Sequence, residues 1–309
     1  MLILTCATLT SFYGIWQHFS GIDLVRADHR VLTQVPWGDG SVFSTIGFFN
    51  NHLTYGHCFM MILCIPWAAL LLAKRPRWWH TLLLLISFSA ILTSLVFTYG
   101  RGVWIAVLVA LPFMAFYASR KLFLLTLGIL VVVGGIVLKR DPLIRERAQS
   151  IIAENNGSNE ERRKLWEANV EMFHDHPWIG VGYKQNEAVT DTYFKKLAIQ
   201  DGVVGNAHSN YIELLATTGM LGFVSYMLFI LAFILMTARL YATIPSTHYW
   251  HKVFVLSALG AQISFHVGGL TQWNFGDPVV QHLFLFWLAV IAYMSQRYYA
   301  HIVPDDHSL

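Results

Sequence analysis

The stretch that decides the fold is LFLLTLGILVVVGGIVL, residues 122–138, in which no side chain is charged. A helix that crosses the hydrocarbon core of a membrane needs about 20 mostly apolar residues. The stretch is therefore predicted to be a transmembrane helix.

Seven further apolar runs have a similar length, at about 1–19, 52–73, 81–98, 103–118, 210–236, 253–270 and 278–296. The first and seventh of the eight spans are the weakest, since they carry Gln17, His18, Gln262 and His266. Only 13% of all residues are charged and 55% are hydrophobic, whereas a soluble domain has about a quarter charged residues. We expect an all-α polytopic membrane protein with about eight transmembrane helices, in which residues 1–309 form a single membrane domain.

Several classes of function find no support in the sequence. The net charge is +3, with no basic tract that indicates nucleic acid and no nucleotide-binding motif. The three cysteines, Cys6, Cys58 and Cys64, lie inside apolar runs and are interpreted as small hydrophobic residues, not as zinc ligands or a disulfide framework. We expect neither a metal nor a cofactor.

The distribution of basic residues predicts the orientation in the membrane. Connections on one side hold Lys74, Arg75, Arg77, Arg120, Lys121, Arg239, Lys252 and Arg297, and those on the other hold Arg26, Arg30 and Arg101. Because cytoplasmic loops are rich in lysine and arginine, both termini are predicted to be cytoplasmic. The loops 20–51, 139–207 and 271–277 and the turn at Arg101 then face outward.

The long outer segment, residues 139–207, is predicted to be structured. Ser158 and Glu161 have the spacing of a capping box, and apolar residues follow at helical spacing up to Phe173. We expect an amphipathic helix near 159–174, which lies either on the membrane surface or against the bundle.

Arg101 lies between two predicted spans that are joined by almost no loop. An arginine close to the bilayer is costly unless it snorkels, pairs or faces a polar cavity. Snorkelling is the simpler interpretation, but the positive-inside rule disfavours an outer arginine, and Gly100 and Gly102 leave the backbone open to a ligand. We therefore predict a functional Arg101.

Arg162 opens the predicted outer helix together with Arg163 and Lys164. A solvated charge run explains Arg163 and Lys164 well. Arg162, however, lies four residues before Trp166 and shares its apolar stripe, so its planar donor fork is placed to meet a phosphate. Arg163 is retained as a substrate-binding candidate.

His208 stands where the outer segment enters the sixth span, and Ser209, Asn210 and Glu213 follow it. A lone interfacial histidine usually makes a structural hydrogen bond. A carboxylate near an imidazole, however, raises its basicity and fixes its tautomer, which suits a general base. We predict a catalytic His208, with Ser209, Asn210, Glu213 and His52 as binding candidates around it.

Three of these stretches resemble the O-antigen ligase family. The family pattern of His, a small polar residue, nine residues, Gly, two residues and Gly is filled by His208, Ser209, Gly219 and Gly222. Residues 98–104 are similar to its Thr-x-Ser-Arg-Gly segment, with Gly100 in place of serine. Residues 162–166 and 175–182 are similar to its outer-loop Arg…Trp…His-Pro…Gly-x-Gly segment.

The resemblance runs from about residue 10 to residue 290 and implies an enzyme. It implies transfer of a glycan from undecaprenyl diphosphate to a sugar hydroxyl of the lipid A core, in lipopolysaccharide assembly on the periplasmic face of a Gram-negative inner membrane. Arg101 and Arg162 would hold the diphosphate, His208 would activate the acceptor, and Glu213 would orient His208, with no metal. Family members often have twelve spans, so this chain is either a short member or lacks N-terminal helices.

Other functions remain open at this point. A polymerase or a protein O-glycosyltransferase of the same superfamily would use the same arginines and histidine. A transporter would explain the spans and the buried polar residues but not a structured outer segment, and no repeated halves are visible in the sequence.

Overall fold

The computed structural model describes residues 2–26, 36–38, 40–74, 77–153, 157–200 and 202–300. Arg30 and Arg75, which entered the charge comparison above, lie outside these residues. The helices are α1 (Leu2–Ser20), α3 (His52–Leu72), α4 (Trp78–Val96), α5 (Arg101–Ala118), α6 (Arg120–Arg140), α7 (Pro142–Gln149), α8 (Gly157–Asp175), α9 (Asn186–Lys196), α10 (Asn210–Thr243), α11 (Tyr249–Gly268) and α12 (Pro278–Ala300). A short antiparallel pair, β1 (Pro36–Trp37) and β2 (Val42–Phe43), and a 3-10 turn at Asn274–Gly276 complete the described elements.

The predicted all-α membrane architecture is confirmed. Each of the eight predicted spans coincides with a helix, and six of these helices, α3, α4, α5, α6, α10 and α12, are long and apolar enough to cross a membrane within the described ranges. The two that fall short are α1 and α11, which the sequence predicts to be the weakest spans because they carry Gln17, His18, Gln262 and His266.

The polar residues of α11 have a structural reason. This helix packs against α3, α5, α10 and α12, and its polar residues Ser257, Gln262 and Ser264 are buried. Gln262 Nε2 donates to Thr237 Oγ1 of α10 at 2.7 Å. A helix that is enclosed by protein can satisfy polar side chains internally, and it needs no continuous apolar surface for lipid.

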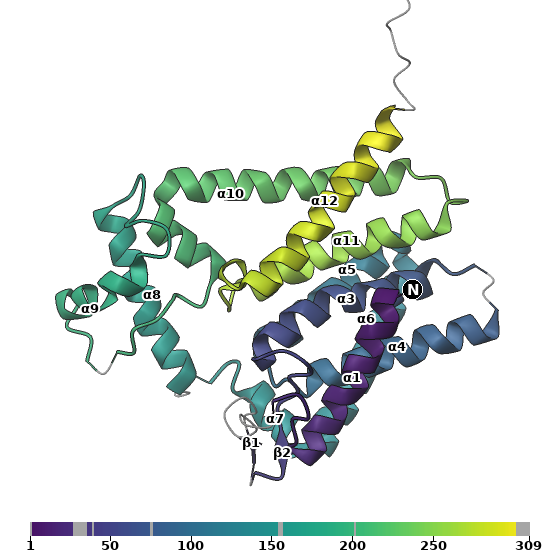
Figure 1. Cartoon of the computed structure of the whole chain (residues 1–309), viewed down its shortest axis with the longest axis horizontal. Coiled ribbons are helices and arrows are strands. Elements are labelled where there is room, and N and C mark those ends of the chain that lie inside the picture. The colour runs from purple at the N-terminus through teal and green to yellow at the C-terminus, as the bar shows by residue number, and fades with distance from the viewer. Residues whose placement is uncertain are drawn as a thin grey trace, which may run out of the picture.

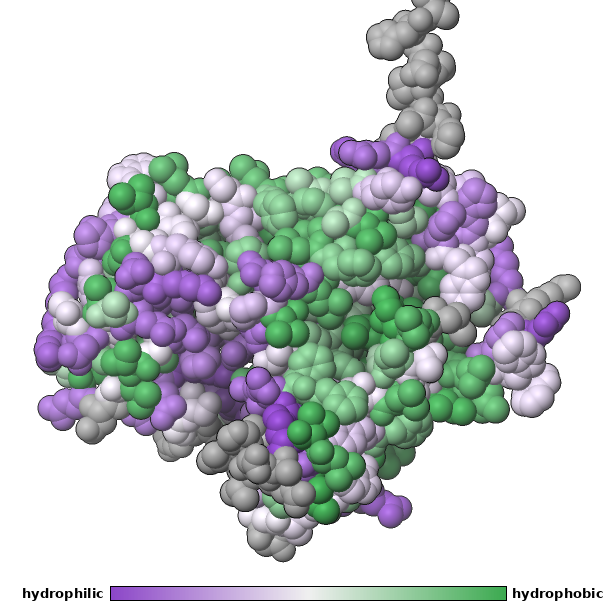
Figure 2. All heavy atoms as spheres, in the orientation of Figure 1, coloured by the Kyte–Doolittle hydropathy of each residue, from purple (hydrophilic) through white to green (hydrophobic). Residues whose placement is uncertain are grey.

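The helix ends that the sequence predicts to face outward meet at one end of the bundle, which we call the site end. Thr45 N donates to Phe97 O at 3.0 Å, and Asn210 N donates to Gly269 O at 2.7 Å. Figure 1 shows α8 and α9 at the left and α7 with the two strands at the bottom of the view, so the outer segment covers this end. In Figure 2 hydrophilic residues gather over the α8–α9 region, whereas the surface over α10 and α12 is largely hydrophobic.

The outer segment packs against the bundle. Leu165 and Met172 on one face of α8 form a small core with Tyr193 and Phe194 of α9 and with Ala216 of α10. Of the two placements that the sequence left open for this helix, the structure has the one against the bundle. This packing fixes the first turns of α8, and with them Arg162, above the site end.

Candidate functional site

Arg101 is the first residue of α5 and ties the α4–α5 turn to the outer segment. Its side chain is buried, with Nη1 donating to Ser150 O at 2.6 Å and Nη2 donating to Ser158 Oγ at 3.1 Å. Ser158 thus lies inside the first turn of α8 and faces Arg101, in place of the capping box expected there. Each Nη carries two N–H groups, so donors of Arg101 are left for a ligand.

The glycine after Arg101 has a different use from the one expected. A Cβ on Gly102 would overlap the hydroxyl of Thr271. The open backbone therefore serves the close approach of the α11–α12 connection, and Gly102 also lines a cavity that contains Arg101. This contact brings residues 268–271 beside Arg101.

Arg162 lies on α8 between two cavities. One cavity, of about 340 Å³, is lined by Arg101, Arg162, Trp166 and Thr271 among others. The second, of about 140 Å³, is lined by Arg162 and His208 together with the first turns of α8 and residues 203–205. Because Arg162 lines both cavities, the three predicted catalytic side chains lie close together around it.

Arg147 is a third arginine near Arg101 and Arg162, and no pattern in the sequence distinguishes it. Its Nε donates to Tyr99 O at 2.9 Å, and its guanidinium lies 4.8 Å from the centre of the Trp37 ring. In sequence Arg147 looks like Arg145, an ordinary charge on a short polar helix. Only the packing of α7 onto the α4–α5 turn distinguishes the two, and no local pattern carries that information.

The three arginines are not neutralised by acidic side chains. None of the ion pairs within the described residues involves Arg101, Arg147 or Arg162. Burial, followed by the positive charges of Arg101 and Arg162, lowers the pKa of Arg147 to about 10, and burial with Arg101 also lowers the pKa of Arg162. A desolvated group of like charges is unfavourable on its own and favours binding of an anion.

His208 is held by a clamp on the residue before it. Ala207 N donates to Glu213 Oε2 at 2.6 Å, and Ala207 O accepts from Trp166 Nε1 at 2.6 Å. His208 itself has φ +46°, and its Nδ1 lies 3.4 Å from Gln272 Oε1. Glu213 thus acts on the backbone before His208, whereas the expected partner for the imidazole, a carboxylate, is replaced by the amide of Gln272.

Replacing Trp166 by phenylalanine is expected to lower an activity that depends on the position of His208. The change removes the donor to Ala207 O and keeps the aromatic ring, so the position of His208 becomes less well defined. Misplacement of a catalytic group by about 1 Å can cost about 100-fold, and we expect a loss of tenfold to 100-fold in kcat with little change in KM. Steady-state kinetics would separate these two constants.

The matched control for that variant is Trp178→Phe. Trp178 is 67% exposed in the same outer segment, so the same chemical change there should leave kcat within a factor of about two. Equal effects of the two substitutions would show that Trp166 does not position His208.

Gly219 breaks α10 and opens its backbone to the outer segment. It has φ +62° and ψ −166° inside the helix, and Figure 1 shows the resulting bend at the left end of α10. Val181 N and Gly182 N donate to Ala216 O and Thr217 O, both at 3.0 Å, and Met220 N donates to Pro177 O at 2.8 Å. At Gly219 the loop 177–182 therefore docks against α10.

The remaining binding candidates have partners inside the protein. Ser209 caps α10 by accepting from Ile212 N at 3.5 Å, and Asn210 Oδ1 accepts from Phe275 N at 3.1 Å. With Glu213, which holds Ala207, both side chains are buried. The structure thus gives these three residues a part in shaping the entry to α10, and none of them lines either cavity beside Arg162.

Arg163 and His52 lie at the edges of the site. Arg163 is exposed and 3.8 Å from Glu167, and it lines the rim of the larger arginine cavity. His52 begins α3, which is capped by the Asn51 side chain, and the charged groups nearest to it include Arg147. Arg163 therefore borders a cavity of the site, whereas His52 is connected to the site by its closeness to Arg147.

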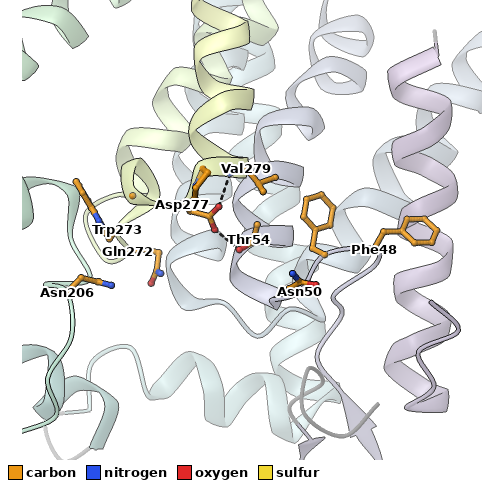
Figure 3. Close-up of a pocket in the computed structure, with 11 residues that line it drawn as sticks. Phe48, Asn50, Thr54, Asn206, Gln272, Trp273, Asp277 and Val279 are labelled. Atoms are coloured by element: carbon orange, nitrogen blue, oxygen red, sulfur yellow. Dashed lines mark hydrogen bonds between the residues drawn. The ribbon is translucent and has the colours of Figure 1, made fainter. Parts of the chain in front are cut away.

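A larger cavity of about 640 Å³ opens on the other side of the His208 segment. Asn206 and Gln272 line one wall, and Asn50 and Asp277 lie across from them, as Figure 3 shows. Asp277 is held in place because it accepts from Thr54 Oγ1 at 2.5 Å and from Val279 N at 3.0 Å. Trp273 and Phe48 supply aromatic surface, so this cavity is polar without the concentration of arginines found on the other side.

The donor sets of the site suit an anion better than a metal ion. Within the described ranges, no group of three or more His, Cys, Asp and Glu side chains is placed to hold a metal. The side chains that line the two cavities beside Arg162 include arginine, histidine, serine and asparagine, which donate hydrogen bonds, and one carboxylate, that of Glu161 in the smaller cavity.

Comparison with known proteins agrees with the motifs. No curated protein matches the chain. A family model described as O-Antigen ligase matches residues 83–227, a segment that contains Arg101, Arg147, Arg162 and His208. The resemblance that the motifs indicated is thereby confirmed for residues 83–227, which are similar to the O-antigen ligase family.

Proposed function

We propose that this protein is an O-antigen ligase, which moves a glycan from undecaprenyl diphosphate to a sugar hydroxyl of the lipid A core. Its family implies a membrane glycosyltransferase-like activity. The observation that carries the proposal is the convergence of Arg101, Arg162 and His208 on two cavities joined at Arg162. An arginine-lined cavity beside a histidine suits a reaction with an anionic leaving group and a hydroxyl nucleophile.

In the proposed reaction the acceptor oxygen bonds to the anomeric carbon of the glycan while the bond from that carbon to the diphosphate oxygen breaks. His208 takes the hydroxyl proton, and the diphosphate leaves with the bonding electron pair. Arg101 and Arg162 stabilise the charge that grows on the diphosphate. Attack from the side opposite the leaving group inverts the anomeric configuration, and no metal takes part.

The cavities on the two sides of His208 differ in their lining, which suits the binding of two different substrates. A hydrogen on His208 Nδ1 would face Gln272 Oε1, which leaves the lone pair of Nε2 to accept a proton. We propose that the diphosphate occupies the arginine side, that the acceptor hydroxyl meets Nε2 in the cavity shared by Arg162 and His208, and that the rest of the acceptor extends toward the cavity lined by Asn206 and Gln272. The site end would then face the periplasm of a Gram-negative inner membrane, where both substrates are available.

The proposal is tested by supplying purified protein with an undecaprenyl-diphosphate-linked glycan and lipid A-core together. A ligase forms glycosylated lipid A-core, releases undecaprenyl diphosphate, and works equally well in EDTA. Lengthening of the glycan on its carrier in the absence of lipid A-core would identify a polymerase instead. Loss of transfer in EDTA that a divalent ion restores would overturn the metal-free mechanism.

The pH dependence of transfer is expected to extend below the usual range of a histidine. Burial and the positive charge of Arg162 lower the pKa of His208 below its ordinary value of 6.5. A general base must be neutral, so kcat/KM should stay constant at neutral pH and fall only as the pH drops through this lowered pKa.

A variant of Arg162 tests whether His208 sets the pH dependence of kcat/KM. Replacing it by glutamine removes a neighbouring positive charge, so the acid limb of the residual kcat/KM should move to higher pH. An acid limb at or above pH 6.5 in the unmodified protein, or one that Arg162→Gln leaves in place, would contradict the assignment of His208 as the titrating base.

A further inference from the structure

Arg147 is held in one orientation by two contacts of different kinds. Its Nε donates to Tyr99 O at 2.9 Å, and the face of its guanidinium lies 4.8 Å from the centre of the Trp37 ring. Trp37 is itself fixed, because its Nε1 donates to Ser44 Oγ at 2.6 Å and its ring stacks on Tyr99 with centroids 4.6 Å apart. One edge and one face of the guanidinium are therefore occupied by the protein.

The opposite edge of the guanidinium has no hydrogen-bond or ion-pair partner among the described residues. Within the described residues, Nε is the Arg147 nitrogen that makes a hydrogen bond, and neither Nη1 nor Nη2 makes one. Two Nη groups side by side form the end-on donor fork that binds two oxygens of a phosphate at once. Because the other contacts fix the plane of the group, little conformational entropy is lost when this fork binds.

The surroundings of Arg147 favour an anion. Arg101 and Arg162 are the charged groups that most affect it, and both are positive. Arg101 and Arg147 link the same two segments in opposite directions. Arg101, at the start of α5, donates to Ser150 at the end of α7, and Arg147 of α7 donates to Tyr99 in the α4–α5 turn. Three arginines brought together by α5, α7 and α8 match the charge of a diphosphate better than two.

We propose that Arg147 is the third arginine of the diphosphate site and that its Nη fork binds phosphate oxygens of the lipid-linked donor and of the released undecaprenyl diphosphate. This inference rests on the proposed function for the identity of the ligand. Trp37 then acts as a positioning residue that holds the plane of the guanidinium. In the stretch Arg145-Glu-Arg147, Arg147 is thus the binding residue and Arg145 is an arginine exposed to solvent.

The test measures binding of undecaprenyl diphosphate to purified protein, with no transfer required. Charge-assisted hydrogen bonds contribute about 1.5–3 kcal/mol, so Arg147→Gln should weaken binding about tenfold to 100-fold. Arg147→Lys keeps the charge and loses the fork, and it should bind about tenfold more weakly than the unmodified protein. Arg145→Gln, on the exposed side of the same helix, should bind normally.

Undecaprenyl monophosphate is the second probe. If Arg147 engages the diphosphate, its loss should reduce the preference of the protein for diphosphate over monophosphate, an effect that general damage to the fold would not produce. Binding by Arg147→Gln and Arg147→Lys equal to that of Arg145→Gln would overturn the role of Arg147 and leave the proposed function intact. Failure of the unmodified protein to bind undecaprenyl diphosphate would overturn both.

Discussion

Replacing His208 by alanine is expected to reduce glycan transfer by about 100-fold to 10,000-fold, the usual contribution of a general base. The imidazole lines the cavity that contains Arg162 and lies beside the opening that contains Gln272. Without it, the acceptor hydroxyl must lose its proton to water. Binding of undecaprenyl diphosphate should change little, because the arginines remain.

The backbone at His208 calls for a second variant. Its φ of +46° lies in the left-handed region, where asparagine is tolerated better than alanine. His208→Asn keeps this conformation and a polar side chain but has no basic nitrogen, so it should lose as much transfer as His208→Ala. Transfer rates of both variants are compared with that of His174→Ala, in which an exposed histidine of α8 is removed. Near-normal transfer by either His208 variant would rule out the base.

Replacing Gly219 by alanine is expected to lower the stability of the protein by about 3 kcal/mol or more. Its backbone angles of φ +62° and ψ −166° lie in a region that costs other residues about 1–3 kcal/mol. A Cβ would in addition overlap the backbone of Trp178 and Ile179, and such forced packing costs about 1–3 kcal/mol. The loop 177–182 would be displaced, and the kinked start of α10 with it.

Thermal unfolding and transfer activity together test this prediction. Gly219→Ala should melt at a lower temperature and transfer less glycan, since the kink positions Glu213 and through it Ala207. Gly134→Ala is the matched control, because a Cβ at Gly134 in α6 meets nothing within 4 Å. The assigned role of the kink fails if the two variants unfold at the same temperature.

Much of the fold could be predicted because a membrane leaves few options. Backbone groups in the hydrocarbon core must bond internally, so an uncharged run such as residues 122–138 has to become a helix. That physical constraint acts on each run separately, and it explains why the predicted spans coincide with helices. This constraint on hydropathy is weaker where a helix is surrounded by protein and not by lipid. The helix α11 is an example, because its buried glutamine and serines lower its hydropathy.

The candidate site could be predicted in part. Arg101 and Arg162 stand out locally, since the first is costly near a membrane and the second interrupts an apolar stripe. Glu213 was expected beside His208, but the helix start turns it toward Ala207, and Gln272 from a distant connection takes its place. Ser209 and Asn210 are polar for structural reasons, as a helix cap and a loop anchor.

By itself the sequence determined the all-helical membrane architecture, because hydropathy and length are properties of single segments. It also predicts Arg101, Arg162 and His208 as the residues that bear chemistry, a prediction that the variants proposed above test. Only the tertiary structure decided what surrounds them, namely the third arginine on α7, the clamp on Ala207 and the loop seated on the kink at Gly219. These contacts join residues far apart in the chain, and their free energy depends on packing geometry that no local pattern encodes.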